Sequence, residues 1–323
     1  MHRRTFTALS LSLFCAAVLP LAHASDAYPN KPIKILIGYP PGGGTDVAGR
    51  AMAQRIQDQL KSTVYVENRP GAGGGLATVT AARAAPDGYT LVVGGIGTQI
   101  ANRTLFPDLG VDPMKDLDPV ANFSSTPLAV VVAADSPFKT VADLIKAGKT
   151  EKGLIYGSGG AGSATHLSVV LFGEMAGTKM THVPYKGSSP ANVDLVSGRL
   201  DFMIDILSSV KPLIDGGRLR MIAVTAKNRL PQYPNVPALA ETPGLTGYES
   251  LNWTGLFAPK GTDPKVIKLV SDALNNPPDY AAFKAKVDAS GATYTPMPSD
   301  KFTSFLKEEY NRWNPIAERE LKK

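Results

Sequence analysis

The feature that most constrains the fold is an alternation of short apolar strands, glycine-rich turns and helices, which occurs twice along the chain. In the first unit, a β-branched run at residues 33–37 precedes a turn with two prolines and three glycines at residues 39–44. Apolar side chains at helical spacing then continue to about Lys61. The second unit begins after Phe123 and has its glycine-rich turn at residues 157–162. This alternation predicts an α/β fold in which parallel sheets carry helices on both faces.

The two units also predict two lobes, for which a chain of 323 residues is long enough. The C-terminal residues hold too few strands for a third sheet, so the simplest arrangement returns them to the first lobe. Two crossover segments, near residues 124–130 and 221–228, then form a hinge of the kind that encloses ligands. We therefore expect residues 25–124 plus 226–323 to form lobe I and residues 125–225 to form lobe II.

Residues 1–24 have the three parts of a cleaved signal peptide: a basic start, an apolar run up to Pro20, and a small-x-small cleavage pattern at residues 22–24. The apolar run is short for a bilayer span, which disfavours an uncleaved membrane anchor. Lipid attachment to Cys15, the one cysteine, is disfavoured because the bulky Phe14 precedes it. The sequence therefore predicts export to the periplasm and a mature chain without cysteine, which suits an oxidising compartment.

The charge of the chain argues against a nucleic-acid partner. The full sequence has 34 basic and 28 acidic residues, and removal of residues 1–24 takes away Arg3 and Arg4 but no acidic residue, which leaves a net charge of +4. The basic residues are scattered, whereas a nucleic-acid-binding protein needs a dense basic stripe. A mild positive charge instead favours the attraction of a small anion.

Enzyme motifs are incomplete. The turn at residues 157–162 matches G-x-G-x-x-G, but the dinucleotide fingerprint also needs an acidic residue after the next strand, and residues 180–186 contain none. The chain has no G-x-x-x-x-G-K-[ST] and no G-x-S-x-G motif. No cluster of His, Cys, Asp or Glu has the spacing of metal ligands. We therefore predict a protein that is not an enzyme and that uses no catalytic residue, no cofactor and no metal.

Both glycine turns follow a strand and lead into a helix N-terminus, which is where open α/β sheets bind ligands. The first helical N–H groups have no acceptor within the helix, and glycine lets the backbone approach a ligand closely. The turns at residues 42–45 and 158–165 therefore predict two halves of an anion site. The alternative is that they are only tight turns. Asp46 would repel an anion, so we expect it to hold the first loop in place.

Five further side chains are candidates for the same cleft, and each has a structural alternative. Tyr39 is a candidate lid over the ligand, and Thr98 either reaches the cleft or caps the next helix. His166 either lines the pocket or packs locally. Lys186 either attracts the anion or is simply solvated, and Asp205 either binds a ligand hydroxyl or amine or caps a helix.

Six short segments form an ordered pattern over essentially the whole mature chain: residues 28–33, 41–46, 67–74, 86–91, 182–187 and 255–259. This pattern resembles the Bug-type solute-binding proteins that serve tripartite tricarboxylate transporters in the bacterial periplasm. The resemblance implies a type II periplasmic binding protein fold, a Venus flytrap of two lobes with a two-segment hinge. It further implies a monomer that delivers a small carboxylate to integral membrane transporter subunits.

The resemblance also implies which residues hold the ligand. One ligand carboxylate is held by both glycine turns, partly through ordered waters, and the implied contacts are Gly43, Gly44, Thr45, Ser158, Ala161, Gly162 and Ser163. The far end of the ligand is then expected to contact four further positions: the two residues before His166, which include Thr165, and the pair Gly97-Thr98. Members of the family bind dicarboxylates, tricarboxylates, amino acids and aromatic carboxylates, so the resemblance does not identify the ligand.

Two other functions stay open at this point. An extracytoplasmic sensor would use the same cleft and would differ only in the surface that docks on a signalling partner. An exported hydrolase would turn over esters, although the sequence has no visible nucleophile or base for it.

Overall fold

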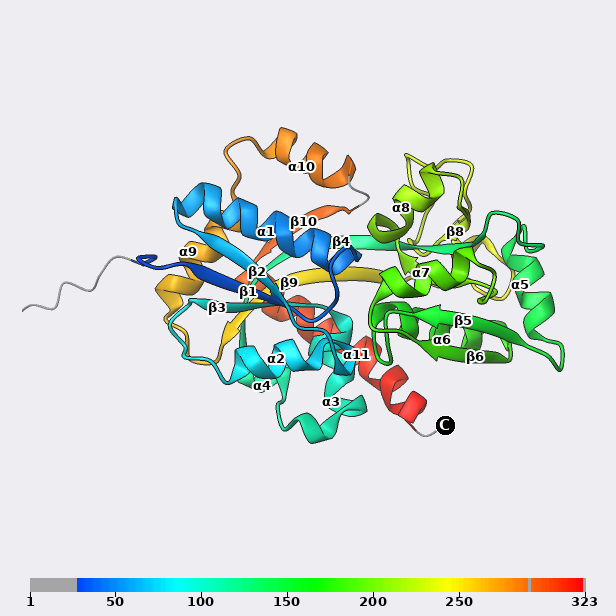
Figure 1. Ribbon diagram of the computed structural model, residues 1–323, viewed down its shortest axis with the longest axis horizontal. Helices are drawn as coiled ribbons and strands as arrows, with labels where there is room; N and C mark the ends of the chain where they lie inside the picture. The colour runs from blue at the N-terminus through cyan, green and yellow to red at the C-terminus, as the bar shows by residue number, and fades with distance from the viewer. Residues whose placement is uncertain (1–27, 290–291, 322–323) are drawn as a thin grey trace, which may run out of the picture.

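The computed structural model describes residues 28–289 and 292–321, so the predicted signal peptide at residues 1–24 lies outside the described residues. Within these ranges, no helix has the length and apolarity needed to cross a membrane. Two lobes lie side by side, and long strands connect them (Figure 1).

The sheet of the first lobe has the strand order β10-β4-β9-β3-β1-β2. Its parallel half consists of β1 (Ile33–Ile37) between β2 (Val64–Asn68) and β3 (Thr90–Gly94), as the first repeat predicts. Its antiparallel half consists of β9 (Leu251–Pro259), β4 (Leu117–Ala133) and β10 (Tyr294–Pro298). The sheet is therefore mixed, a difference from the expected parallel sheet, because the C-terminal strands return to the first lobe in the opposite direction.

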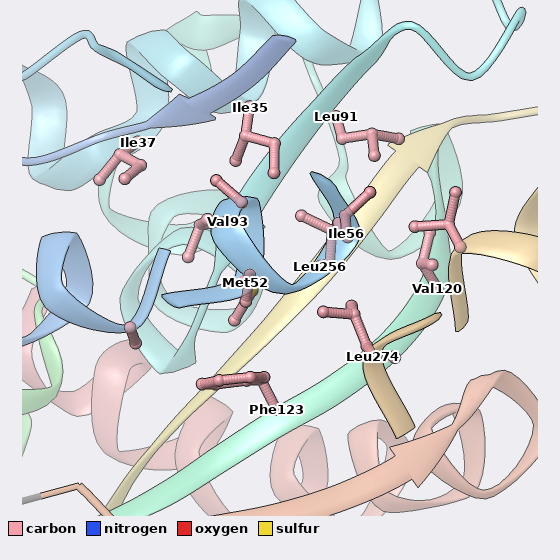
Figure 2. Close-up of a cluster of buried hydrophobic side chains, with 14 of the residues drawn as sticks. Ile35, Ile37, Met52, Ile56, Leu91, Val93, Val120, Phe123, Leu256 and Leu274 are labelled. Carbon is pink, nitrogen blue, oxygen red and sulfur yellow. The ribbon is translucent and has the colours of Figure 1, made fainter. Parts of the chain in front are cut away.

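Helices cover both faces of this sheet (Figure 1). They are α1 (Gly44–Leu60), α2 (Gly75–Ala82), α9 (Pro264–Asn275), α10 (Tyr280–Ala289), α11 (Ser299–Leu321) and the short α3 (Asn102–Leu105) and α4 (Pro113–Asp116). Met52 and Ile56, one turn apart on α1, pack on Ile35 and Val93 of the sheet (Figure 2). This packing holds the N-terminus of α1 at the edge of the lobe.

The second lobe uses the far half of β4. There β4 pairs antiparallel with β7 (Met203–Ile206) and β8 (Leu219–Val224), while β5 (Leu154–Ser158) and β6 (Met180–Pro184) pair in parallel. The helices of this lobe are α5 (Val141–Gly148), α6 (Ala164–Ala176), α7 (Ser188–Val196) and α8 (Leu207–Asp215).

The hinge consists of β4 and of the return connection into β9. The hydroxyl of Thr225 accepts a hydrogen bond from the backbone N–H of Leu128 at 2.8 Å and donates to the carbonyl of Ser250 at 2.5 Å. Between these points, residues 226–250 pack on the second lobe, because Leu239 and Tyr248 are buried in its core. We therefore propose that the second lobe extends to about residue 250, beyond the boundary that the sequence suggests between residues 225 and 226.

Helix α11 lies under the first lobe and continues toward the second (Figure 1). Trp313 and Phe302 of α11 share a buried cluster with Leu167 of α6, and Arg319 near the end of α11 pairs with Glu174 at 2.9 Å. The C-terminal segment therefore contacts both lobes.

Candidate functional site

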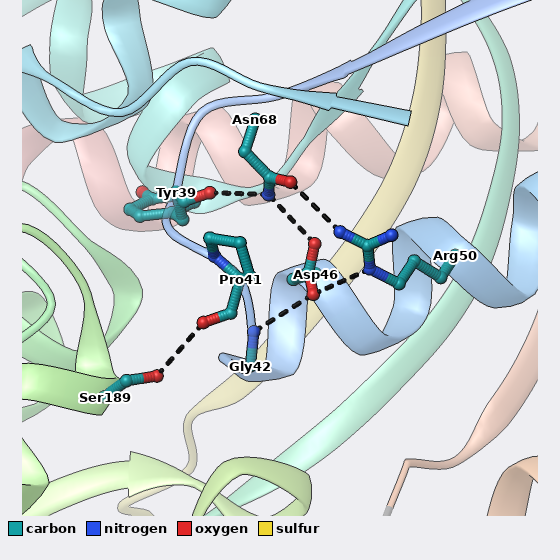
Figure 3. Close-up of polar contacts among 7 residues, drawn as sticks. All are labelled: Tyr39, Pro41, Gly42, Asp46, Arg50, Asn68 and Ser189. Carbon is teal, nitrogen blue, oxygen red and sulfur yellow. Dashed lines mark hydrogen bonds and ion pairs between the residues drawn. The ribbon is translucent and has the colours of Figure 1, made fainter. Parts of the chain in front are cut away.

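The turn after β1 is held by a buried carboxylate. Asp46 accepts hydrogen bonds from the N–H of Gly42 at 3.0 Å, from Nε of Arg50 at 2.9 Å and from Nδ2 of Asn68 at 2.9 Å (Figure 3). Burial alone would raise the pKa of Asp46, but the hydrogen bonds from Arg50, Asn68 and Gly42 hold that pKa below its usual value. Asp46 thus supports the loop from behind, as expected, and the N-terminus of α1 faces the opposite lobe.

The turn after β5 is stabilised by its own hydroxyls. Ser163 is the N-cap of α6, and its Oγ accepts a hydrogen bond from the N–H of His166 at 3.2 Å. Oγ1 of Thr165 accepts from the N–H of Gly159 at 2.8 Å and lies 2.9 Å from Oγ of Ser163. The N–H of Gly162 donates to Nδ1 of His166 at 3.1 Å, so this N–H is already used within the turn.

Two histidine rings stack behind the second turn. The rings of His166 and His182 are 4.0 Å apart, and Nε2 of His182 lies 2.6 Å from Oγ of Ser158. Burial, with a smaller effect of the neighbouring His166, lowers the pKa of His182 to about 3. His182 is therefore neutral at physiological pH, and the hydroxyl of Ser158 belongs to the support of the turn. Nε2 of His166 lies 3.7 Å from a carboxylate oxygen of Glu320 on α11.

The two turns line one cavity between the lobes, with a volume of about 30 Å³. Its lining comes from both lobes and from one hinge strand: Tyr39, Pro40, Gly43, Gly44, Thr45, Gly159, Ser163, Ala164, Thr165, Gly187, Ser188, Ile206 and Asn252. The helices α1 and α6 thus point their N-termini into the same space from opposite lobes. Across the described ranges, the N–H groups of Gly44, Thr45, Ala164 and Thr165 donate to no protein acceptor.

The lobes are in contact around this cavity. Oγ of Ser189 lies 3.5 Å from the carbonyl oxygen of Pro41 (Figure 3), and a Cβ atom added to Gly44 would lie 2.7 Å from Cγ2 of Ile206. A Cβ atom on Gly187 would likewise lie 2.7 Å from the ring of Pro40. The structure is therefore a closed arrangement in which glycines allow the two backbones to approach.

The structure brings six of the predicted site residues to the cavity wall: Tyr39, Gly43, Gly44, Thr45, Ser163 and Thr165. Four others build the second turn behind the wall: Ser158, Ala161, Gly162 and His166. The remaining three lie elsewhere: Thr98, Lys186 and Asp205. Lys186 is exposed and does not line the cavity.

Thr98 and Asp205 are buried and hydrogen-bonded within their own lobes. Oγ1 of Thr98 accepts from the N–H of Gly95 at 3.0 Å, so its hydroxyl holds the turn after β3. Asp205 accepts from Oγ of Ser188 at 2.6 Å and from Nδ2 of Asn192 at 3.0 Å. Burial raises the pKa of Asp205, while these hydrogen bonds oppose the rise. Asp205 therefore orients the first turn of α7 beside the cavity.

Tyr39 is a fixed part of the wall. Its hydroxyl donates to the carbonyl of Gly73 at 2.9 Å, and burial raises its pKa. The hydrogen bond stays within the first lobe, so the ring lies against its own lobe in the closed arrangement.

Sequence reasoning missed several lining residues. Gly187 and Ser188 form a third turn of the strand–glycine–helix type, so the same signal that found the other two turns applies to them. Asn252 lies inside the apolar strand β9 and has no local signal. No charged side chain lines the cavity within the described ranges, and no group of acidic, histidine or cysteine residues there has the arrangement of a metal site.

Comparisons with known proteins agree with this geometry. A family model described as "Tripartite tricarboxylate transporter family receptor" matches residues 48–321. The chain is 35% identical to Protein BugT of Bordetella pertussis, over 91% of this chain and 90% of BugT. It is 34% identical to a UPF0065 protein of Pseudomonas sp. (strain P51), over 98% of this chain and 93% of the relative.

Solved structures are similar over most of both chains. A structure described as a periplasmic transporter has a TM-score of 0.84 and 35% identity, over 92% of this chain and 98% of its own. An R. palustris protein solved with adipate has a TM-score of 0.84 and 31% identity, over 90% and 97% of the two chains. MatC from Rhodopseudomonas palustris with bound malate has a TM-score of 0.83 and 30% identity, over 90% and 100%.

Proposed function

This chain belongs to the tripartite tricarboxylate transporter receptor family, and we propose that it captures a small carboxylate between its lobes and delivers it to the membrane subunits of such a transporter. Its fold and family are those of periplasmic solute-binding proteins, which are not enzymes. Beyond the fold and the family, the proposal specifies two things: the class of ligand and the transporter as the partner.

One observation carries the proposal: two helix N-termini from opposite lobes face one cavity with N–H groups that have no acceptor among the residues that the structure describes. Each helix N-terminus contributes roughly 0.3–1 kcal/mol toward an anion at an exposed site and up to about 2 kcal/mol when partly buried. Micromolar affinity requires about 8 kcal/mol, so direct hydrogen bonds from Gly44, Thr45, Ala164 and Thr165 have to add to the helix effect. A carboxylate suits this arrangement because its two oxygens accept from both lobes at once.

Binding requires the lobes to move. The cavity of about 30 Å³ is far smaller than ligand pockets, which typically hold about 300–1,000 Å³. The ligand therefore enters an open form, and closure brings the second turn onto the carboxylate that the first turn holds. The adipate and malate in the two R. palustris structures support a carboxylate as the ligand.

The proposal is tested by a thermal-shift screen of the mature protein against monocarboxylates, dicarboxylates, tricarboxylates and aromatic carboxylates. We expect at least one of them to raise the melting temperature, because a ligand that binds only the folded state stabilises it. If no carboxylate in the four classes does so, the proposed function is wrong.

We expect Thr45→Val to weaken every carboxylate that binds. The substitution keeps the shape of the side chain but removes the hydroxyl beside the N-terminus of α1. A hydrogen bond to a charged group is worth about 1.5–3 kcal/mol, so Kd rises roughly ten- to hundredfold in calorimetry. An unchanged Kd for all ligands would remove the Thr45 hydroxyl from the binding site.

We further propose that residues 1–24 are removed on export and that the mature protein is a monomer. Mass spectrometry of protein secreted to the periplasm would give the N-terminus, and the expected product begins at Ser25. Light scattering of the same sample would give the mass of one chain.

A further inference from the structure

One side chain from the hinge itself reaches the cavity. The other lining residues come from the last residue of a strand, from the turns after strands or from the first residues of helices, but Asn252 lies within β9, where it pairs with Thr126 of β4. Both strands belong to the hinge, so Asn252 lies where the chain passes from one lobe to the other. Its side chain is buried, with a relative exposure of 6%.

Most polar side chains of the cavity already have partners within the protein. The hydroxyls of Ser163 and Thr165 accept backbone N–H groups, and the hydroxyl of Ser188 donates to Asp205. Their hydrogen bonds hold the turns in shape. They therefore have little capacity to distinguish one ligand from another.

Asn252 differs from these residues. Its Nδ2 donates to Oγ1 of Thr254 at 3.3 Å, and its Oδ1 accepts no hydrogen bond from the described part of the chain. A primary amide offers two donors and an acceptor, and rotation about χ2 exchanges its ends. A buried amide that faces a ligand cavity with one end unpaired stabilises a ligand only if that ligand provides the missing partner.

We infer that Asn252 is a specificity-determining residue that hydrogen-bonds a second polar group of the ligand, a hydroxyl. This inference rests on the proposed function, in which the two helix N-termini hold the first carboxylate. The ligand class is then a polar-substituted carboxylate. Its hydrocarbon analogue is rejected because it would bury the amide end without a partner.

The test uses matched ligands that differ by one polar group: malate and succinate, lactate and propanoate, and 4-hydroxybenzoate and benzoate. Calorimetry gives Kd for both members of each pair with the wild-type protein. We expect the hydroxylated member of at least one pair to bind about tenfold more tightly or better, which corresponds to one net hydrogen bond. In Asn252→Leu, which has a similar size and no polar group, the ratio should fall to about one.

Two variants separate a role of Asn252 in specificity from a general loss of affinity. Thr45→Val should weaken both members of a pair by the same factor, because it contacts the carboxylate that they share. Thr254→Val removes the partner that orients Asn252 and should reduce the ratio without abolishing it. This second variant also tests the inference if Asn252→Leu does not fold.

The outcomes are distinguishable. If the wild-type protein binds no carboxylate of the screen, the proposed function fails. If it binds carboxylates but does not distinguish the members of any pair, or if both Asn252→Leu and Thr254→Val leave the ratios unchanged, the inference about Asn252 is overturned while the proposed function stands.

Discussion

At the scale of single residues, the second turn rests on a histidine that stays neutral. The stacked rings of His166 and His182 fill the space behind the turn, and the hydroxyl of Ser158 is tied to Nε2 of His182. A charged ring in this position would have to be desolvated beside a second imidazole. The support of the second glycine turn is therefore sensitive to acid.

This arrangement predicts a pH dependence of stability. The pKa of His182 is about 3 in the folded protein against an ordinary value of 6.5, so below pH 6.5 the unfolded chain binds a proton that the folded protein does not. The stabilisation is complete above pH 6.5 and is lost as pH falls toward 3, by up to about 1.4 kcal/mol per pH unit. Urea unfolding of the wild type and of His182→Gln should show a shallower loss in the variant between pH 6.5 and 4.

Measurement at pH 8 provides the control, because His182 does not titrate there in either state. The difference between the two proteins at pH 8 gives the packing cost of the substitution alone. Parallel curves for the two proteins down to pH 4 would contradict the assigned role of His182.

At the scale of elements, the N-terminus of α1 depends on a glycine that faces the other lobe. Gly44 is the first residue of the helix, and its missing Cβ leaves room for Ile206, whose Cγ2 would lie 2.7 Å from an added methyl group. Because Cγ2 is on the branched carbon of Ile206, it cannot simply rotate away. Closure of the lobes is thus coupled to the size of one side chain at the end of the first glycine turn.

We expect Gly44→Ala to fold normally and to bind every carboxylate ligand more weakly. Overpacking costs about 1–3 kcal/mol, and here it acts on the closed form, so Kd should rise about five- to hundredfold in calorimetry.

The matched control for this variant is Gly49→Ala on the same helix, where the new methyl group would lie 2.5 Å from Cδ1 of Ile37 within one lobe. That variant should lower the melting temperature and leave Kd unchanged. Equal affinities for Gly44→Ala and the wild type would show that the closed contact is not needed for binding.

At the scale of the whole molecule, one hydroxyl links both crossings of the hinge. Thr225 is fully buried and bonds to Leu128 on the outgoing strand and to Ser250 before the returning strand. The two crossings therefore move together, while α11 contacts both lobes from below.

We expect Thr225→Val to destabilise the protein by about 1–3 kcal/mol, because the shape is kept while the N–H of Leu128 and the carbonyl of Ser250 lose their buried partner. Chemical denaturation measures this loss. Thr225→Ser keeps the hydroxyl and should lose clearly less. If the valine and serine variants are equally stable, the hydroxyl does not link the two crossings.

Much of the fold could be predicted because its signals are local. The strand–glycine–helix units predicted β1, α1, β5 and α6, and with them the two turns that line the cavity. The family resemblance is confirmed, and so are the two-lobed fold and the class of solute-binding protein. The individual ligand contacts stay predictions.

The sequence by itself determined where backbone N–H groups gather, because a turn and the helix that follows it depend on neighbouring residues. Only the tertiary structure decided which side chains share the cavity. The hydroxyl of Ser158 faces a histidine and Asp205 faces the first turn of α7, whereas Asn252 reaches the cavity through strand pairing between distant segments. Such pairings are set by the packing of two lobes around a hinge, and no local pattern of residues encodes them.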